Sequence, residues 1–544
     1  MTAARTLTQP KEHGSPPRSL WLTLALTLMI AVMGRALLLA SGTLSFHSDE
    51  AIVGLLARHI LAGERPIFFM GQAYMGTLDS WLIAVGFRLL GESVMAIRLV
   101  QSALYLLVVA SAYYAAWALS RRVTIAWVTS LTFAIGSPLV TLYTTATLGG
   151  YNEAMILGHL LVGLGYTIAR DPARAPWRWA VFGLAAGLGW WTNALIVVYA
   201  VPVGIYLLYR LVRGGRLPVG GVVLAVVGFF IGSAPWWVYS FSHELATIRF
   251  FFPDLFQSDE PVGAMLPSQP FDVRILGLFL FGFPVVIGAR FPWTGDYFAP
   301  LIGVIVLTVF VFAWYVFWRR RKTHLLPGVF ALMGGIVIML CAVYLITRFS
   351  SDPSGRYFLP LTLPFGFALG VFVSALPGRI LGAGVMLLVL GYFAAGQWSA
   401  ARAPEGFTTQ FVANTHLHNG DDDALMAWLD EHDIQHGYTS YWVSFRLAFL
   451  SGERIQLSAS VPDNADLAWT TAFERYAPYR QATDSAERVA YIILGDRLPE
   501  VETALTAWFA DEGVQYEMAD VGIYRIYYDF TPRVPRPPLP FIPS

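Results

Sequence analysis

Long apolar runs separated by short polar segments fill the first 400 residues of the chain. The first run, Leu20–Ala40, is close to the roughly 20 residues that an α-helix needs to cross a bilayer. It exceeds the roughly 7–15 apolar residues of a signal peptide, so it predicts an uncleaved first helix. Further runs lie near residues 93–119, 124–143, 152–169, 177–191, 193–211, 218–240, 298–318, 325–346, 355–375 and 379–398. The pattern predicts an α-helical polytopic membrane protein with roughly 11 transmembrane helices.

Some apolar segments do not fit a simple span. The pieces near 79–91 and 274–289 are shorter than a span, so we expect them to be interfacial or re-entrant. The run 177–211 is interrupted by "GWWTN", which leaves its division into two helices open.

The periodicity changes after about residue 400. "DDDALMAWLDEHDI" and "ETALTAWFADEG" have the pattern of helices, whereas "VAYIILGD" and "GIYRIYY" have the pattern of strands. A small external α/β domain therefore follows the membrane region. The predicted parts are a disordered cytoplasmic N-terminus (1–19), a transmembrane domain (20–400) with an external loop (42–92), the α/β domain (401–530) and a Pro-rich tail (531–544).

Composition supports this picture and excludes some functions. The chain is 56% hydrophobic and 13% charged, against about 25% charged residues in soluble domains. Its 36 basic and 36 acidic residues cancel, so binding to nucleic acid has no electrostatic support. The single cysteine, Cys341, excludes an internal disulfide and a cysteine-based metal site.

Basic residues fall in alternate short loops, and such loops are cytoplasmic. The other loops must then be external, including segment 42–92, the turn 347–354 and everything after about residue 399. We therefore expect a multi-pass protein of the cell membrane whose C-terminal domain lies outside. The basic residues are Arg121, Arg122, Arg170, Arg174, Arg178, Arg210, Arg213, Arg216 and those at 319–322.

An acidic stretch, "FHSDE", stands where the chain leaves the first span. Ser48 is suited to cap a helix, and Asp49 and Glu50 suit its first turn, where carboxylates favour the helix dipole. The following "AIVGLLARHIL" then predicts an amphipathic helix on the outer surface. Against this purely structural interpretation, the pair opens a long loop rich in glycine and aromatic residues, and such loops are often functional.

The chain resembles the GT-C fold polytopic glycosyltransferases, which include the protein O-mannosyltransferases and the aminoarabinose transferases. Asp49-Glu50 in the first external loop resembles their acidic signature, and "SGRYFLPLTLPF" at 354–365 resembles the segment that opens a late span in bacterial members. The resemblance implies a glycosyltransferase acting outside the cytoplasmic membrane. Its donor would be a polyprenyl-phosphate sugar, and its acceptor a hydroxyl of a lipid, glycan or protein.

The resemblance also implies roles for the acidic pair. Asp49 matches the catalytic position and would be the general base that takes the proton of the acceptor hydroxyl. A single base is sufficient for direct displacement, which inverts the anomeric centre. Glu50 is the second catalytic candidate, and it would either orient the site or face water.

Arg356 is the expected cation at the donor phosphate, because its guanidinium binds phosphate through two parallel donors. The alternative is a local pair with Asp352, and Arg348 is the reserve candidate. Tyr357 would line the lipid or sugar site. Since base, sugar and phosphate must be contiguous, the loop that holds Asp49 and the turn around Arg356 should face one another.

Other polar residues are candidates for substrate binding. Glu153 starts a span and either matches a further acidic position of the family or serves as a helix cap. Tyr74 and Asp79 would hydrogen-bond sugar hydroxyls, although Asp79 could equally cap a helix. His159 is expected to be a packing residue.

Carboxylate and imidazole groups are suitable metal ligands, and the first loop offers His47, Asp49 and Glu50. The sequence has no second His/Asp cluster with the spacing of metal ligands, so we expect no metal and no cofactor.

A transporter or lipid-linked sugar flippase is the alternative function, although the spans show no evident inverted repeat and few charges at mid-span. A non-catalytic assembly or sensor protein is a third possibility, supported by the external domain.

Overall fold

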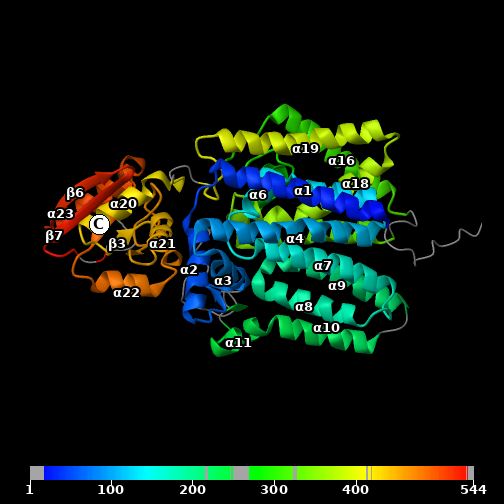
Figure 1. Cartoon of the computed structure of the whole chain (residues 1–544), viewed down its shortest axis with the longest axis horizontal. Helices are drawn as coiled ribbons and strands as arrows, with labels where there is room; N and C mark the ends of the chain where they lie inside the picture. Colours follow the sequence, from blue (N-terminus) through cyan, green and yellow to red (C-terminus); the bar gives the residue numbers. More distant parts are fainter. Residues whose placement is uncertain are drawn as a thin grey trace, which may run out of the picture.

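The molecule consists of an elongated helical bundle with a smaller α/β domain at one end (Figure 1). Most of the expected N-terminal segment (1–19) and most of the Pro-rich tail lie outside the described residues. This computed structural model describes residues 17–214, 218–245, 247–248, 269–322, 327–411, 415–417, 419–534 and 536.

The bundle confirms the polytopic helical class. Its helices are α1 (Arg18–Ser41), α4 (Val94–Ser120), α5 (Val123–Ala134), α6 (Pro138–Tyr143), α7 (Tyr151–Arg170), α8 (Trp177–Thr192), α9 (Val197–Gly214), α10 (Val219–Gly232), α11 (Ala234–Ser242), α14 (Phe271–Gly277), α15 (Phe283–Val286), α16 (Pro300–Arg319), α17 (Val329–Ile346), α18 (Thr362–Ala375) and α19 (Arg379–Arg402). Every predicted apolar run contains one of them. The run around "GWWTN" is two helices, since α8 ends at Thr192 and Asn193 caps the next turn.

Among the described residues, seven helices are long and apolar enough to cross a membrane. The pair α10–α11, bent by 58°, brings the number to eight. This is fewer than the roughly eleven expected, because α5 and α8 are only 12 and 16 residues long and α7 begins with polar residues. Large apolar side chains are exposed on the outer surface of the bundle. Leu301, for example, is 84% exposed and Ile380 is 90% exposed. Such a surface requires lipid around it, so the chain is a multi-pass membrane protein.

Two predicted spans are broken where the backbone demands it. Gly136 takes a positive φ of 63° between α5 and α6, and Pro138 then starts α6. Likewise α10 ends at Gly232, and Pro235 stands in the first turn of α11. Proline suits the first turn of a helix because the amide it lacks has no partner there.

The segment between α1 and α4 contains α2 (Ser48–Ala62), the short strands β1 (Phe68–Phe69) and β2 (Gln72–Gly76), and α3 (Leu78–Leu90). It lies between the bundle and the C-terminal domain (Figure 1). The expectation that α2 lies on the outer surface is wrong. Most of its residues are buried, because α3 packs on one side of it and α21 (Tyr441–Leu450) on the other.

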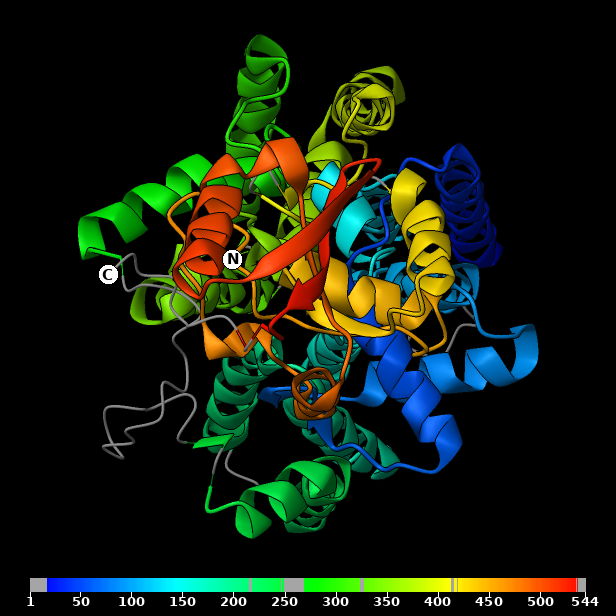
Figure 2. The same ribbon diagram turned by 90° about the vertical axis from the view of Figure 1, so that its left-hand side faces the viewer.

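The C-terminal domain is an α/β unit with one mixed sheet, as expected. The strand order is β4-β3-β5-β7-β6, in which β3 is parallel to β4 and β5 while β7 is antiparallel to its neighbours. Viewed from its own end, the domain lies in front of the bundle (Figure 2). Besides α21 its elements are α20 (Asp422–Glu431), β3 (His436–Thr439), β4 (Gln456–Ser458), α22 (Ala477–Ser485), β5 (Ala490–Ile493), α23 (Pro499–Asp511), β6 (Gln515–Val521) and β7 (Tyr524–Thr531).

Candidate active site

Asp49 lies in the first turn of α2, where this helix contacts the C-terminal domain. Its Oδ1 accepts a hydrogen bond of 2.5 Å from the hydroxyl of Tyr441, and Nη1 of Arg475 lies 3.5 Å from the same oxygen. Both partners belong to the C-terminal domain. Among the described residues, no group donates a hydrogen bond to Oδ2, so this oxygen remains available to a substrate.

The charges around Asp49 keep its carboxyl ionised. Burial alone would raise its pKa, but the charge of Arg475 and the hydrogen bond from Tyr441 outweigh burial, and the pKa lies below its usual 3.8. Arg356 lowers the pKa further, so the guanidinium of Arg356 is within electrostatic reach of Asp49. A carboxylate in this state can accept a proton at neutral pH.

Arg356 follows a tight turn at the start of a 3₁₀ segment, Arg356–Leu361. Its Nε forms an ion pair of 2.7 Å with Asp352, and its Nη2 donates to the hydroxyl of Tyr357 at 3.3 Å. The predicted local pair with Asp352 is therefore present. Nη1 forms no hydrogen bond within the described part of the chain, so Arg356 still has a donor to offer an anion.

The turn that precedes Arg356 is held by a hydrogen bond from a buried arginine, Arg290. Arg290 is fully buried, and its Nη2 donates to the carbonyl of Pro353 at 2.6 Å. Gly355 has a φ of 75°, which an L-residue rarely adopts, and a side chain there would also collide with Val285. The sequence "SDPSGRY" therefore sets the direction in which Arg356 leaves the backbone.

Tyr74, on β2, joins these residues. Its pKa is raised by burial, while the charges of Arg475 and Arg356 act to lower it. The negative charges of Asp49 and Asp352 also act on this hydroxyl and raise its pKa. Asp49, Tyr74, Arg356 and Tyr357 thus lie within electrostatic or hydrogen-bond reach of one another, and the loop between α1 and α4 lies near the turn around Arg356.

Glu50 lies apart from this cluster. Its carboxylate is fully buried and receives two bonds from Arg98 of α4, Nε to Oε1 and Nη2 to Oε2, each at 3.2 Å. The alternative in which Glu50 faces water is therefore wrong. The geometry favours a role in fixing α2 to the bundle, and a catalytic role for Glu50 stays a prediction.

Asp79 and Glu153 form a second, buried group. Asp79 is fully buried in α3 and accepts hydrogen bonds from Gln101 at 2.6 Å, from Thr147 and from the amide of Gly150. Burial raises the pKa of Asp79 despite these donors. Neither carboxylate oxygen of Glu153 has a hydrogen-bond partner within the described part of the chain. A sugar would have to displace protein donors to reach Asp79, so its predicted role gains no support from this geometry.

The remaining candidates have mainly structural surroundings. His47 caps α2 through Nδ1, which accepts from the amide of Glu50 at 3.4 Å, and burial lowers its pKa. His159 is fully buried and its Nδ1 is 3.0 Å from the hydroxyl of Ser111, as expected for a packing residue. Arg348 stands in the turn before Arg356, but its side chain is not among those described. Within the described ranges, no three His, Cys, Asp or Glu residues are grouped so as to hold a metal ion.

Sequence reasoning missed Tyr441 and Arg475. They contact Asp49 across a separation of about 400 residues, and nothing in their local sequence distinguishes them from other aromatic and basic residues of the domain. The only available signal was the expectation that both the C-terminal domain and Asp49 lie on the external side.

Comparison with solved structures identifies the architecture. The crystal structure of ArnT from Cupriavidus metallidurans bound to undecaprenyl phosphate matches 97% of this chain and all of its own, with a TM-score of 0.58 and 15% identity. The chain has the GT-C fold. The apo structure of the same ArnT matches 93% of the chain with a TM-score of 0.56 and 14% identity. No protein-family model and no curated protein matches the sequence.

Proposed function

We propose that this protein is a membrane glycosyltransferase that moves a sugar from a polyprenyl-phosphate donor to an acceptor hydroxyl on the external face of the membrane. The observation that carries the proposal is a carboxylate, Asp49, and a cation, Arg356, that lie within electrostatic reach of one another. Asp49 has a lowered pKa, and its Oδ2 accepts no hydrogen bond from the described part of the chain. The GT-C fold supports the choice, since the ArnT structure with this fold contains undecaprenyl phosphate.

The proposed chemistry is a single displacement. The acceptor oxygen attacks the anomeric carbon while its proton passes to Oδ2 of Asp49. The bond between the anomeric carbon and the phosphate oxygen breaks, and the phosphate keeps the electron pair. Arg356 stabilises the charge that develops on the departing phosphate, and Tyr74 and Tyr357 would contact the sugar or lipid phosphate. Attack opposite to the leaving group inverts the anomeric centre.

The test separates binding from transfer, using the purified full chain in lipid nanodiscs. Undecaprenyl phosphate measures donor-site binding, and a panel of undecaprenyl-phosphate sugars with cell-envelope lipids measures transfer. Asp49→Asn should bind undecaprenyl phosphate normally. Its rate of transfer should fall by about 10²-fold or more, because the variant lacks the base. Arg356→Ala should weaken binding, and Arg356→Lys should restore only part of it because lysine lacks the two-pronged donor.

Two controls make the outcome decisive. Arg454→Ala removes an exposed arginine of the C-terminal domain that pairs with Asp430 at the surface, and it should change neither quantity. Asp352→Ala tests whether Arg356 acts only through its ion pair. Near-normal transfer by Asp49→Asn would remove the base assignment, and normal binding by Arg356→Ala, or the same defect in Asp352→Ala, would remove the phosphate assignment.

A further inference from the structure

The C-terminal domain reaches the candidate active site with two side chains. Tyr441 is the first residue of α21, and Arg475 stands two residues before α22, next to its N-cap residue Tyr476. Each contacts Oδ1 of Asp49, the tyrosine through its hydroxyl and the arginine through Nη1. The base of the proposed reaction is thus held by residues from outside the membrane domain.

These two side chains are themselves held in place. The guanidinium of Arg475 stacks over the ring of Tyr441 with its central carbon 4.7 Å from the ring centre, and the Arg475 side chain is only 12% exposed. The backbone of Arg475 packs against Gly71 in the turn between β1 and β2. Gly71 has a φ of 67°, and a Cβ there would lie 3.0 Å from the Arg475 Cα, so glycine is favoured where the two segments meet.

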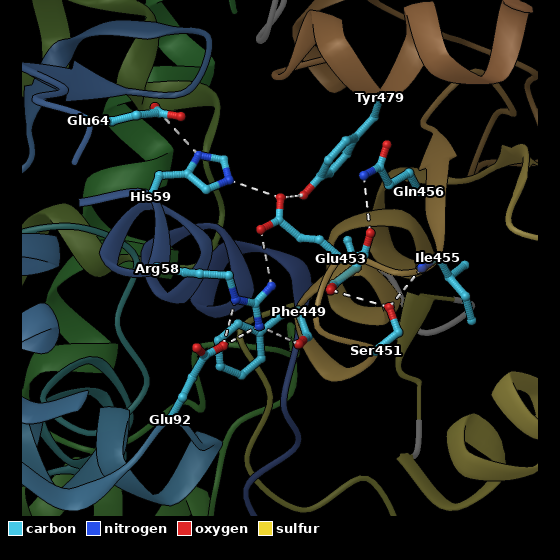
Figure 3. Close-up of polar contacts among 11 residues, drawn as sticks. Arg58, His59, Glu64, Glu92, Phe449, Ser451, Glu453, Ile455, Gln456 and Tyr479 are labelled. Carbon is cyan, nitrogen blue, oxygen red and sulfur yellow. Dashed lines mark hydrogen bonds and ion pairs between the residues drawn. The ribbon is translucent and has the colours of Figure 1, made fainter. Parts of the chain in front are cut away.

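The whole domain is also fixed to α2 by an ion-pair cluster, shown in Figure 3. Oε1 of Glu453 lies 2.9 Å from Nε2 of His59 and accepts a hydrogen bond of 2.6 Å from Tyr479, while Oε2 lies 3.3 Å from Arg58. Arg58 also donates to the carbonyl of Phe449 at 2.9 Å. We call Arg58, His59, Glu453 and Tyr479 the α2 clamp. At the other end of α2, Ser48 donates to the carbonyl of Tyr441 at 2.7 Å.

We propose that the C-terminal domain completes the active site, with Tyr441 and Arg475 as positioning residues that fix Oδ1 of Asp49 and leave Oδ2 as the proton acceptor. This inference rests on the proposed function. A carboxylate with one oxygen anchored by two partners cannot rotate freely, so the other oxygen keeps one direction. Positioning of this kind matters because small displacements of a catalytic group can cost about 10²-fold in rate.

The same contacts set the charge state of the base. Arg475, His47, Tyr441 and Arg356 act to lower the pKa of Asp49, and the hydroxyl of Tyr74 on β2 also lies within electrostatic reach of this carboxyl. Burial opposes ionisation, and Arg475 is the strongest of the groups that favour it. Loss of Arg475 should therefore make Asp49 harder to ionise, which a purely structural role for the residue would not do.

The experiment measures the protonation of Asp49 directly, without a sugar donor. A carbodiimide modifies the protonated carboxyl, so the modified fraction of the Asp49 peptide, read by mass spectrometry across pH, gives its titration midpoint. In the full chain, Arg475→Gln should raise this midpoint by about one pH unit or more, and Tyr441→Phe should raise it less. Transfer, measured with the donor panel, should fall about 10-fold or more in both variants while undecaprenyl phosphate still binds.

Matched controls are Arg454→Gln and Tyr516→Phe, both at exposed positions of the same domain, and both should leave the midpoint unchanged. Arg475→Lys keeps the charge, and it should keep a near-normal midpoint even if Arg475→Gln folds poorly. The inference would be overturned if Arg475→Gln left the titration midpoint of Asp49 unchanged. It would also be overturned if Arg475→Lys shifted the midpoint as far as Arg475→Gln does. Failure of the proposed function alone would appear differently, as an absence of transfer in the unaltered protein with the titration shifts intact.

Discussion

At the scale of single residues, two adjacent carboxylates of α2 have different surroundings. Within the described residues, one oxygen of Asp49 receives no hydrogen bond, whereas both oxygens of Glu50 are bonded to Arg98. The difference follows from helix geometry, because successive residues point about 100° apart and so face different neighbours. One acidic motif thus supplies a candidate base and a structural ion pair.

The surroundings of Glu50 give a prediction that separates the two roles. Glu50→Gln should destabilise the protein by about 3 kcal/mol, since it leaves the nearly buried charge of Arg98 without its partner. Thermal unfolding of the purified protein measures this, and the double variant Glu50→Leu with Arg98→Leu should recover part of the loss. If Glu50→Gln unfolds like the original protein yet cannot transfer sugar, Glu50 is catalytic and our interpretation is wrong.

At the scale of elements, the α2 clamp joins a membrane-domain helix to the C-terminal domain, and it should depend on pH. The hydrogen bond to Glu453 raises the pKa of His59 above 6.5, so the contribution of His59 is complete below pH 6.5 and is lost as pH rises through the raised value. Despite burial, His59 and Tyr479 lower the pKa of Glu453 to about 2, so its contribution is complete above pH 4.5 and is lost as pH falls toward 2. The contact between α2 and α21 should therefore be strongest between these limits.

Hydrogen exchange of the α2 and α21 peptides, corrected for intrinsic rates, measures this dependence. Protection should decrease as pH rises from 6.5 through the raised pKa of His59, because the protonated form is lost. His59→Gln should show weaker protection at pH 6 and little further change with pH. An equal decrease in His59→Gln would mean that another group titrates at the interface.

At the scale of the whole molecule, the candidate site lies at the end of the bundle that carries the C-terminal domain (Figures 1 and 2). The arginine-rich loops between spans predict that the opposite end is cytoplasmic. Orientation can be tested in intact cells because Cys341 is the only cysteine in the chain. With Cys341→Ala as background, a membrane-impermeant maleimide should label Arg454→Cys and not Arg174→Cys, both of which replace exposed residues. The reverse pattern would place the site inside and rule out the proposed orientation.

The sequence alone determined the membrane architecture and the position of the main candidate. Hydropathy summed over about 20 residues is a local property, so each predicted run contains a helix in the structure. The composition change near residue 400 matches the end of α19 at Arg402. Asp49 and Arg356 were chosen by their places next to span ends and by the resemblance of their segments to GT-C glycosyltransferases, which again uses local information.

Tertiary structure decided the partners of each side chain. It covered α2 on both faces, paired Glu50 with Arg98, and placed Tyr441 against Asp49 across 392 residues of chain. Such contacts depend on how the domain packs against the bundle, and a side chain's local sequence contains no record of a partner so far away. Periodicity could therefore give the number and type of elements, but only packing could show that two domains build one site.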